Sequence, residues 1–264
     1  MQYVIGFFIA LFIALTGVGA GTITVPLLVL FLGVPAPEAV GIGLMFSAAV
    51  KLVLVPTHVI RGNVAFRTLG LMLLGGAPGV LIGSFLLQRL ITAGSQNLLN
   101  GILGAILVTT AAWQILRSFR PMTQDSTRAD RGFLLPWLML PVGAEVGFSS
   151  AGAGALGSAA LLGLTPLAPV QVIGTDLAFG FTLSLLGSGA HLFARGIETQ
   201  LLAQLIAGGL AGAIGGLVLS TRIPRRPLRL VLSIWLLILG GQFLFHSYQA
   251  HTVQAAPAVS RSIR

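Results

Sequence analysis

The single lysine of this chain, Lys51, lies in the middle of a long apolar segment, whereas all fourteen arginines lie in the connections and tails between such segments. A cation at the centre of a bilayer costs about 2.5–3.5 kcal/mol even on a lenient insertion scale, so an ionisable residue there indicates function. Ser47 and His58 lie four residues before and seven residues after Lys51, which places the three side chains on one helix face. We predict that Lys51 is the cationic contact for an anion inside a membrane.

Acidic side chains and histidines lie in other apolar segments. Glu145 and Asp176 are of the type that carries protons in coupled transport, although each could instead be the structural partner of an arginine. His58 and His191 could take part in coupling, or could be side chains near helix ends that reach water. We predict coupling or gating roles for His58, Glu145, Asp176 and His191, with Asp176 balancing the charge of Lys51 when the site is empty.

Two apolar stretches, residues 3–32 and 133–163, are too long for one comfortable span and are interrupted at their middles by small residues. Because glycine disfavours helix, we expect each stretch to break and to restart near Thr22 and near Ala155. A restarting helix presents unpaired N–H groups to an anion, and neighbouring hydroxyl groups can donate to its oxygens. The alternative is that the small residues only allow close helix packing. The substrate-binding residues predicted at the breaks are Thr16, Gly19, Gly21, Thr22, Ser149, Ser150, Gly152 and Gly154.

Composition indicates what surrounds these residues. With 55% hydrophobic residues, 8% charged residues and a mean hydropathy of +0.97, the chain lacks the polar surface of a soluble domain. The net charge of +9 comes from arginines beside apolar segments, which fits the positive-inside rule and argues against nucleic acid as a partner. The chain has no cysteine, and we predict no cofactor and no metal. Its start lacks a basic region and a cleavage site, so we expect no removable signal peptide.

Segments of about 20 apolar residues predict an all-α polytopic membrane protein. The expected spans are 39–60, 68–87, 96–116, 170–194, 201–219 and 228–247. We divide the chain into a first transmembrane repeat (1–116), a polar linker (117–132), a second transmembrane repeat (133–247) and a disordered polar tail (248–264). Each repeat has a glycine-broken helix or re-entrant hairpin plus three spanning helices.

The two halves repeat each other at an offset of 133 residues. Lys51 and His58 correspond to Ser184 and His191, so the predicted helices 39–60 and 170–194 both carry a polar stripe. The matching glycines are Gly19 and Gly21 with Gly152 and Gly154, Gly75-Gly76 with Gly208-Gly209, Gly79 with Gly212, and Gly83 with Gly216. We expect the glycines from Gly75 to Gly83, and their counterparts from Gly208 to Gly216, to serve helix packing. Internal duplication with helix breaks at equivalent positions is typical of secondary transporters.

The chain resembles the sulfite exporter TauE/SafE family of membrane permeases. The resemblance rests on motifs of both halves: Gly17-Val18-Gly19-Ala20-Gly21 with Val25-Pro26-Leu27-Leu28, Gly33-Val34-Pro35 with Ala39-Val40-Gly41, His58 with Arg61-Gly62-Asn63-Val64, Gly152-Ala153-Gly154, Gly174-Thr175, His191, Gly196 and the arginine-rich Pro224–Arg229. It implies transport of small anions, typically sulfite, organosulfonates or related oxyanions, and it adds Thr175 to the substrate-binding residues. The family pattern usually has glycine at Ala20 and Ala153 and a small hydroxyl residue at Asp176.

We interpret the chain as a multi-pass permease of the plasma (inner) membrane for small oxyanions, and not as an enzyme. Its partners are the anion and the lipid bilayer, while proton or sodium coupling and homo-oligomer formation stay open. A passive anion channel shares every feature used above. An intramembrane serine protease, with the serine of the Gly147-Phe148-Ser149 stretch as nucleophile and His191 as base, is a weaker alternative because no glycine follows the serine and the duplication is left unexplained.

Charge counting favours one topology. If residues 3–32 and 133–163 each span once, the arginines divide nine against five between the two sides of the membrane. If each stretch is a hairpin that enters and leaves on one side, the repeats are inverted and the arginines divide ten against four. The second arrangement fits the positive-inside rule better. It puts Arg61–Arg67, Arg117–Arg131 and Arg222–Arg229 in the cytoplasm and both termini outside.

Overall fold

This computed structural model describes residues 1–16, 20–94, 96–118, 130–151, 153–192, 199–219, 233–234, 237–242 and 244–245. The described residues form helices and no strands, which confirms the predicted all-α fold. The first half contains α1 (Gln2–Thr16), α2 (Ala20–Leu32), α3 (Ala36–Ile60), α4 (Phe66–Thr92) and α5 (Gln96–Ser118). The second half contains the 3₁₀ turn η1 (Gly132–Leu134), α6 (Leu135–Ser149), the π-helical turn η2 (Ala153–Gly157), α7 (Ser158–Leu164), α8 (Pro169–Leu192) and α9 (Thr199–Leu219).

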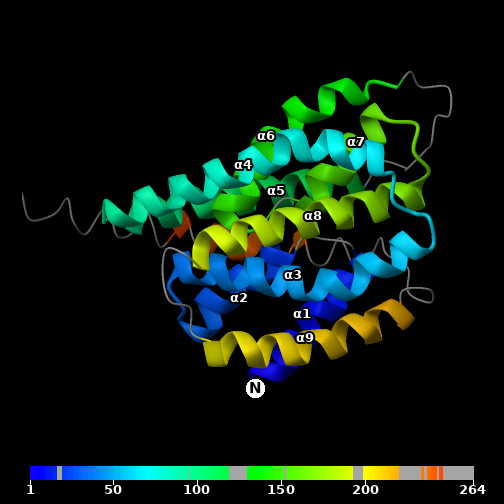
Figure 1. The fold of residues 1–264 in the computed structure, drawn as a ribbon. Coiled ribbons are helices and arrows are strands. Elements are labelled where there is room, and N and C mark those ends of the chain that lie inside the picture. The colour runs from blue at the N-terminus through cyan, green and yellow to red at the C-terminus, as the bar shows by residue number, and fades with distance from the viewer. Residues whose placement is uncertain are drawn as a thin grey trace, which may run out of the picture.

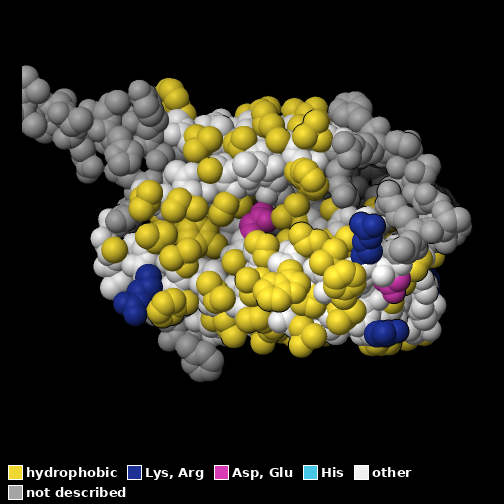
Figure 2. Space-filling model, turned by 90° about the horizontal axis from the view of Figure 1, so that it is seen from above, with side chains coloured by type: hydrophobic (Ala, Val, Ile, Leu, Met, Phe, Trp, Pro, Cys, Tyr) yellow, Lys and Arg dark blue, Asp and Glu magenta, His cyan; other side chains and the backbone are white. Residues whose placement is uncertain are grey.

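Five segments of the described chain are long and apolar enough to cross a membrane: α3, α4, residues 132–149, α8 and α9. Four of them coincide with predicted spans. The apolar part of α5, Gly101–Leu116, is shorter, and the predicted span 228–247 lies mostly outside the described residues. Large apolar side chains such as Leu74, Trp137 and Val218 are more than two-thirds exposed, and Figure 2 shows hydrophobic side chains over much of one face. Lipid solvates such a surface, so the chain is a multi-pass membrane protein.

Both predicted helix breaks are present. The first apolar stretch consists of α1 and α2, and the second of α6, η2 and α7. The pieces α1, α2 and α7 have 15 residues or fewer, and 15 residues give only about 22 Å of helix, which is short of the roughly 30 Å hydrocarbon core. Only α6, which continues from η1 into an 18-residue apolar segment, comes closer to that length. The structure therefore contains no single helix that spans the membrane over residues 20–32 or 153–164.

The broken stretches fold as hairpins. Gly33, at φ +66°, forms the turn from α2 into α3, a conformation that side chains with a Cβ rarely adopt. Because of this turn, α2 and α3 run antiparallel. In contrast, α3 and α9 run in the same direction (Figure 1). In the second half, the Arg131 N–H donates to the Leu164 carbonyl at 2.8 Å, which joins the start of the α6 hairpin to its end.

Each hairpin packs along a long helix of the other half. The glycines of α4 and α9 lie against main-chain carbonyls of α6 and α1, where a Cβ would overlap them. The pairs are Gly75 with Pro136, Gly79 with Leu140, Gly83 with Ala144, Gly208 with Tyr3, and Gly212 with Phe7. Residue numbers rise together along both partners, so α4 is parallel to α6 and α9 to α1. Bare Cα atoms allow this close approach, as the packing interpretation of these glycines predicted.

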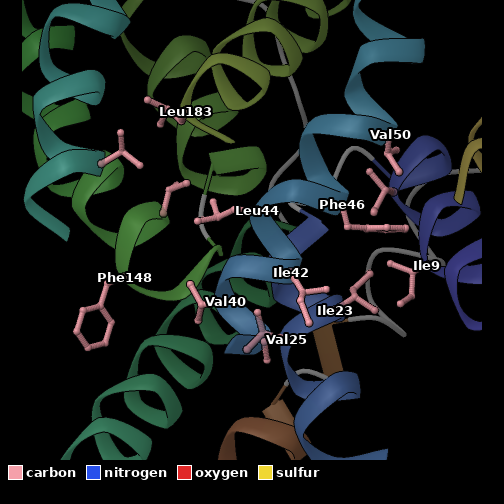
Figure 3. Packing of buried hydrophobic residues seen from close by; sticks show 14 of the residues in the cluster. Ile9, Ile23, Val25, Val40, Ile42, Leu44, Phe46, Val50, Phe148 and Leu183 are labelled. Atoms are coloured by element: carbon pink, nitrogen blue, oxygen red, sulfur yellow. The ribbon is translucent and has the colours of Figure 1, made fainter. Parts of the chain in front are cut away.

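The centre of the molecule is the crossing of α3 and α8 (Figure 1). Ser47 contacts Ser184, and Leu44 lies against Gly187, so the two helices are antiparallel. Buried apolar side chains surround α3: Figure 3 shows Phe46 facing Ile9 of α1, and Ile42 beside Ile23 of α2. This packing fixes the position of the polar residues on the inner faces of α3 and α8.

The helix starts of the two halves show a constant spacing. The starts of α1, α2, α3 and α4 precede those of α6, η2, α8 and α9 by 133 residues each (2 to 135, 20 to 153, 36 to 169 and 66 to 199). This is the offset predicted for the internal repeat, and the antiparallel course of α3 and α8 is the relation that an inverted repeat requires. The duplication itself stays a prediction.

Candidate functional site

The tip of the second hairpin is shaped by its own serines. Ser150 ends α6 in the left-handed conformation, at φ +61°, and its N–H donates to the Val146 carbonyl at 2.8 Å. The Ser149 hydroxyl donates to the Glu145 carbonyl at 2.9 Å and accepts from the Ala151 N–H at 3.2 Å. The N–H groups of Ser150 and Ala151 are therefore both satisfied within the tip.

The start of α2 meets this tip. Gly21 lies against the Ser150 main chain so closely that any Cβ would overlap it. A Cβ on Gly43 of α3 would be 3.1 Å from the Ser150 Oγ, so the hydroxyl lies in the space between α2 and α3. Thr22 and Thr24 of α2 are also buried. The two breaks, predicted as separate anion sites, thus lie together.

Ser150 has the clearest unsatisfied polar group at this place. Its side chain is 5% exposed, and its Oγ has no hydrogen-bond partner among the described residues. A buried hydroxyl without a partner costs about 1–3 kcal/mol, and such groups in native structures call for an explanation. A bound ligand that accepts a hydrogen bond is one explanation.

Lys51 lies buried at the α3–α8 crossing. It is 4% exposed, and its Nζ donates to the Ser184 Oγ at 3.5 Å. The Ser184 hydroxyl contacts the Ser47 Oγ at 2.9 Å and the Gly180 carbonyl at 2.6 Å. The polar stripes predicted on the two helices do meet here. The hydrogen bond from the Lys51 Nζ joins it to Ser184, its predicted repeat counterpart.

Asp176 is held at a different level. Its Oδ2 accepts from the Ser158 Oγ at 2.6 Å, and Gly157 lies against its other oxygen. Asp176 precedes Ser184 on α8 by eight residues, or about 12 Å. The carboxylate interacts with Lys51 electrostatically, and its hydrogen bond is with the start of α7.

Other predicted residues serve neighbouring contacts. Thr175 accepts from the Ala65 N–H at 2.9 Å and thus holds the start of α4, away from the hairpin tip. His191 Nε2 donates to the Gly147 carbonyl at 3.4 Å on α6, and His58 is half-buried near the end of α3. Among the described residues, Ser149 and His191 form no hydrogen-bonded pair, so this geometry does not support the protease alternative.

Three predicted residues cannot be placed in the site. Gly19 and Gly152 lie outside the described residues, and only the helical backbone of Thr16 is described. Gly154 lies in η2, a π-helical turn directly after the tip. Such turns are frequent at functional sites.

Glu145 faces away from the centre, toward a cavity between α4, α5 and α6. Its Oε1 accepts from the Thr110 Oγ1 at 2.6 Å. The cavity has a volume of about 550 Å³ and mostly apolar walls, including Ile82, Leu86 and Phe148. Thr110 was missed by the sequence analysis, although a hydroxyl within the apolar segment 96–116 was a signal that could have found it.

The fold and the site together define a class of protein. Broken hairpins around a buried cation, in a chain with several membrane-spanning helices, are features of polytopic membrane transporters. The family model described as "Sulfite exporter TauE/SafE" matches residues 3–243, and the chain belongs to this family.

A curated relative agrees with this class. The chain is 28% identical over 246 residues to "Probable membrane transporter protein YjnA" of Bacillus subtilis (strain 168), which covers 89% of this chain and 95% of the relative. No solved structure gives a significant match. The chain is therefore a membrane transporter of the TauE/SafE family.

Proposed function

We propose that this transporter carries small oxyanions, sulfite or an organosulfonate, and that the anion is held between Lys51 and the hairpin tip. The single observation that carries the proposal is the buried Ser150 hydroxyl, which has no partner among the described residues and points between α2 and α3. A sulfur oxyanion offers several acceptor oxygens. The proposed site supplies hydroxyl donors and one cation to match them.

Helix geometry supports a common site. Side chains on a helix lean toward its N-terminus, and the contact with Ser184 places the Lys51 ammonium near the level of Ser47. Ser47 is one turn, or about 6 Å, from Gly43, beside which the Ser150 Oγ lies. An anion of a few ångströms across can therefore contact the cation at one end and the tip at the other.

The start of α2 adds a second source of positive potential. This 13-residue helix begins at Ala20, and its first N–H groups have no partner within the helix. Thr22 and Thr24 lie in its first turns and are buried. Gly21 allows the hairpin tip to approach the helix start directly, so that the Ser150 hydroxyl and the helix end can act on one ligand.

The proposed substrate class comes from the family. The description of the matching family model names a sulfite exporter. Uptake into liposomes should be compared for sulfite, sulfate, thiosulfate, a taurine-like sulfonate and a carboxylate. Flux against a substrate gradient, driven by an opposing proton or sodium gradient, would show a coupled carrier, whereas purely downhill flux would show a passive anion channel.

Replacing Ser150 by alanine is expected to weaken anion binding at least about tenfold, because the ligand loses one hydroxyl donor and a net hydrogen bond to a charged group is worth about 1.5 kcal/mol or more. Binding to detergent-solubilised protein measures this directly. Ser188→Ala is the matched control, since the Ser188 hydroxyl is also buried and donates to the Leu185 carbonyl of its own helix. Equal affinity in Ser150→Ala and Ser188→Ala would exclude Ser150 as an anion ligand.

We also propose an inverted arrangement of the two halves, with both hairpins re-entrant. The constant offset of 133 residues and the antiparallel α3 and α8 support it. It places the carboxyl end of α3 and the start of α8 on the cytoplasmic side, together with Arg61, Arg67 and Arg131.

Single cysteines test this topology because the natural chain has none. We expect cysteines at Ser126 and Ser220 to react with an impermeant thiol reagent only from the cytoplasmic side, and a cysteine at Ser95 only from outside. If each broken stretch spanned once, Ser220 would be labelled from outside and the amino terminus would be cytoplasmic. Either result would exclude the inverted arrangement. The three positions themselves lie outside the described residues.

A further inference from the structure

The cavity between α4, α5 and α6 opens on the lipid-facing side of the molecule. Ile82, Leu86 and Trp113 line it and are exposed, and its volume is about 550 Å³. Of the described residues that line this cavity, Glu145 is the ionisable one.

The Glu145 carboxyl group is connected to the proposed anion site through one turn of helix. The Thr110 hydroxyl donates to its Oε1 at 2.6 Å, which joins α6 to α5. The main-chain carbonyl of Glu145 accepts from the Ser149 hydroxyl at 2.9 Å, within the hairpin tip. A change in the contact between Glu145 and Thr110 therefore acts on the helix turn that positions Ser150.

The neighbouring helices offer no cation that faces the carboxyl group in the described part of the chain. On α4, Arg89 lies over the ring of Phe85, with 4.9 Å between its guanidinium carbon and the ring centroid. On α8, His191 contacts the Gly147 carbonyl. On α5, Arg117 comes seven residues, or about 10 Å of helix, after Thr110. An ionised carboxylate in apolar surroundings is costly, so a proton is the partner that this geometry favours.

We propose that Glu145 is a proton-binding site that faces the membrane hydrocarbon through this cavity, and that its proton is the one coupled to movement of the hairpin tip. The coupling rests on the proposed function, whereas the proton site does not. The carboxyl group gains its proton in one state of the tip and releases it in another. The contact with Thr110 differs between these two states.

A hydrophobic carbodiimide tests the site without any transport assay. The protonated carboxyl group adds to the reagent: its oxygen bonds to the central carbon, its proton moves to a nitrogen, and no group leaves. We expect dicyclohexylcarbodiimide, added to the protein in liposomes, to modify Glu145, as read by peptide mass spectrometry. The modification should decrease as the pH rises. A cationic, water-soluble carbodiimide should modify exposed Asp130 instead, at least tenfold more than Glu145.

Two variants complete the experiment. Glu145→Gln should abolish this modification and should transport anion at a rate that changes less with pH than the wild-type rate, because the amide keeps the size and the acceptor oxygen but cannot exchange a proton. Thr110→Val removes only the hydroxyl contact and should keep the modification. No modification of Glu145 by the hydrophobic reagent, or equal modification by both reagents, would overturn the proton site. An unchanged pH dependence in Glu145→Gln would overturn the coupling.

Failure of this inference is distinguishable from failure of the proposed function. If Ser150→Ala weakens anion binding but Glu145 is not modified, the anion site stands without this proton site. If Glu145 is modified and no oxyanion is transported, the proton site stands and the proposed substrate is wrong.

Discussion

Alanine at position 51 is expected to weaken anion binding about a hundredfold, the largest effect of any single substitution in the proposed site. Lys51 is the one cation at the α3–α8 crossing among the described residues, and a charge-assisted hydrogen bond in a site without water is worth about 3 kcal/mol. Equilibrium binding of sulfite to purified protein gives the result directly. Asp176→Asn should keep the affinity, since the amide oxygen can still accept from Ser158. It should also flatten the pH dependence of binding, because an amide does not take up a proton.

Stability separates this effect from misfolding. A buried cation is itself costly, and its replacement by an apolar side chain of similar length is often neutral or stabilising. Lys51→Met should therefore lose anion binding while its thermal unfolding temperature stays equal or rises. Normal binding by Lys51→Ala, together with a wild-type pH profile in Asp176→Asn, would make both residues structural and leave the site at the hairpin tips alone.

Valine at position 21 is expected to abolish transport while most of the protein still inserts and folds. The reason is steric: a Cβ on Gly21 overlaps the Ser150 main chain and forces the two hairpin tips apart. Folding should survive because the Gly33 turn and the bond from Arg131 to Leu164 hold the hairpins at their other ends. Initial uptake rates and the yield of folded protein measure the two effects.

Gly83→Val is the matched control of equal size. Gly83 lies in the middle of the long contact between α4 and α6, against the Ala144 carbonyl, so a side chain there separates two helices along their length. We expect little folded protein from Gly83→Val. The interpretation of Gly21 would be contradicted by wild-type uptake in Gly21→Val, or by a loss of folded protein as large as that of Gly83→Val.

Local rules were enough to predict most helices and both breaks. The apolar lengths of 39–60 and 170–194 predicted α3 and α8. The small residues in the two long stretches predicted restarts near Thr22 and Ala155, which the structure places two residues earlier, at Ala20 and Ala153. The equal spacing of polar residues on the two long helices predicted their inner faces. These signals depend on neighbours in the sequence, and the bilayer makes them stronger because it restricts which backbone structures are allowed.

Contacts between distant residues were not predictable in the same way. Ser150 meets Gly21 across about 130 residues, and Thr110 reaches Glu145 from a helix whose orientation no local pattern indicates. Thr175 matched a family motif, yet its hydroxyl contacts the start of α4. Such pairs depend on how helices cross, and without an observed crossing a single sequence leaves many partners equally acceptable for one hydroxyl.

The exchange of hairpins between halves also has a consequence for biosynthesis. Tyr3 packs against Gly208, so the groove that receives α1 is made about 200 residues after α1 itself. At about 5–20 residues per second, the first hairpin waits on the order of 10–40 s in the membrane before its partner helix leaves the ribosome. During that interval its glycine-rich tip has no native neighbour from the second half. We expect this nascent stage to be the one at which an insertion chaperone or a membrane protease acts on the chain.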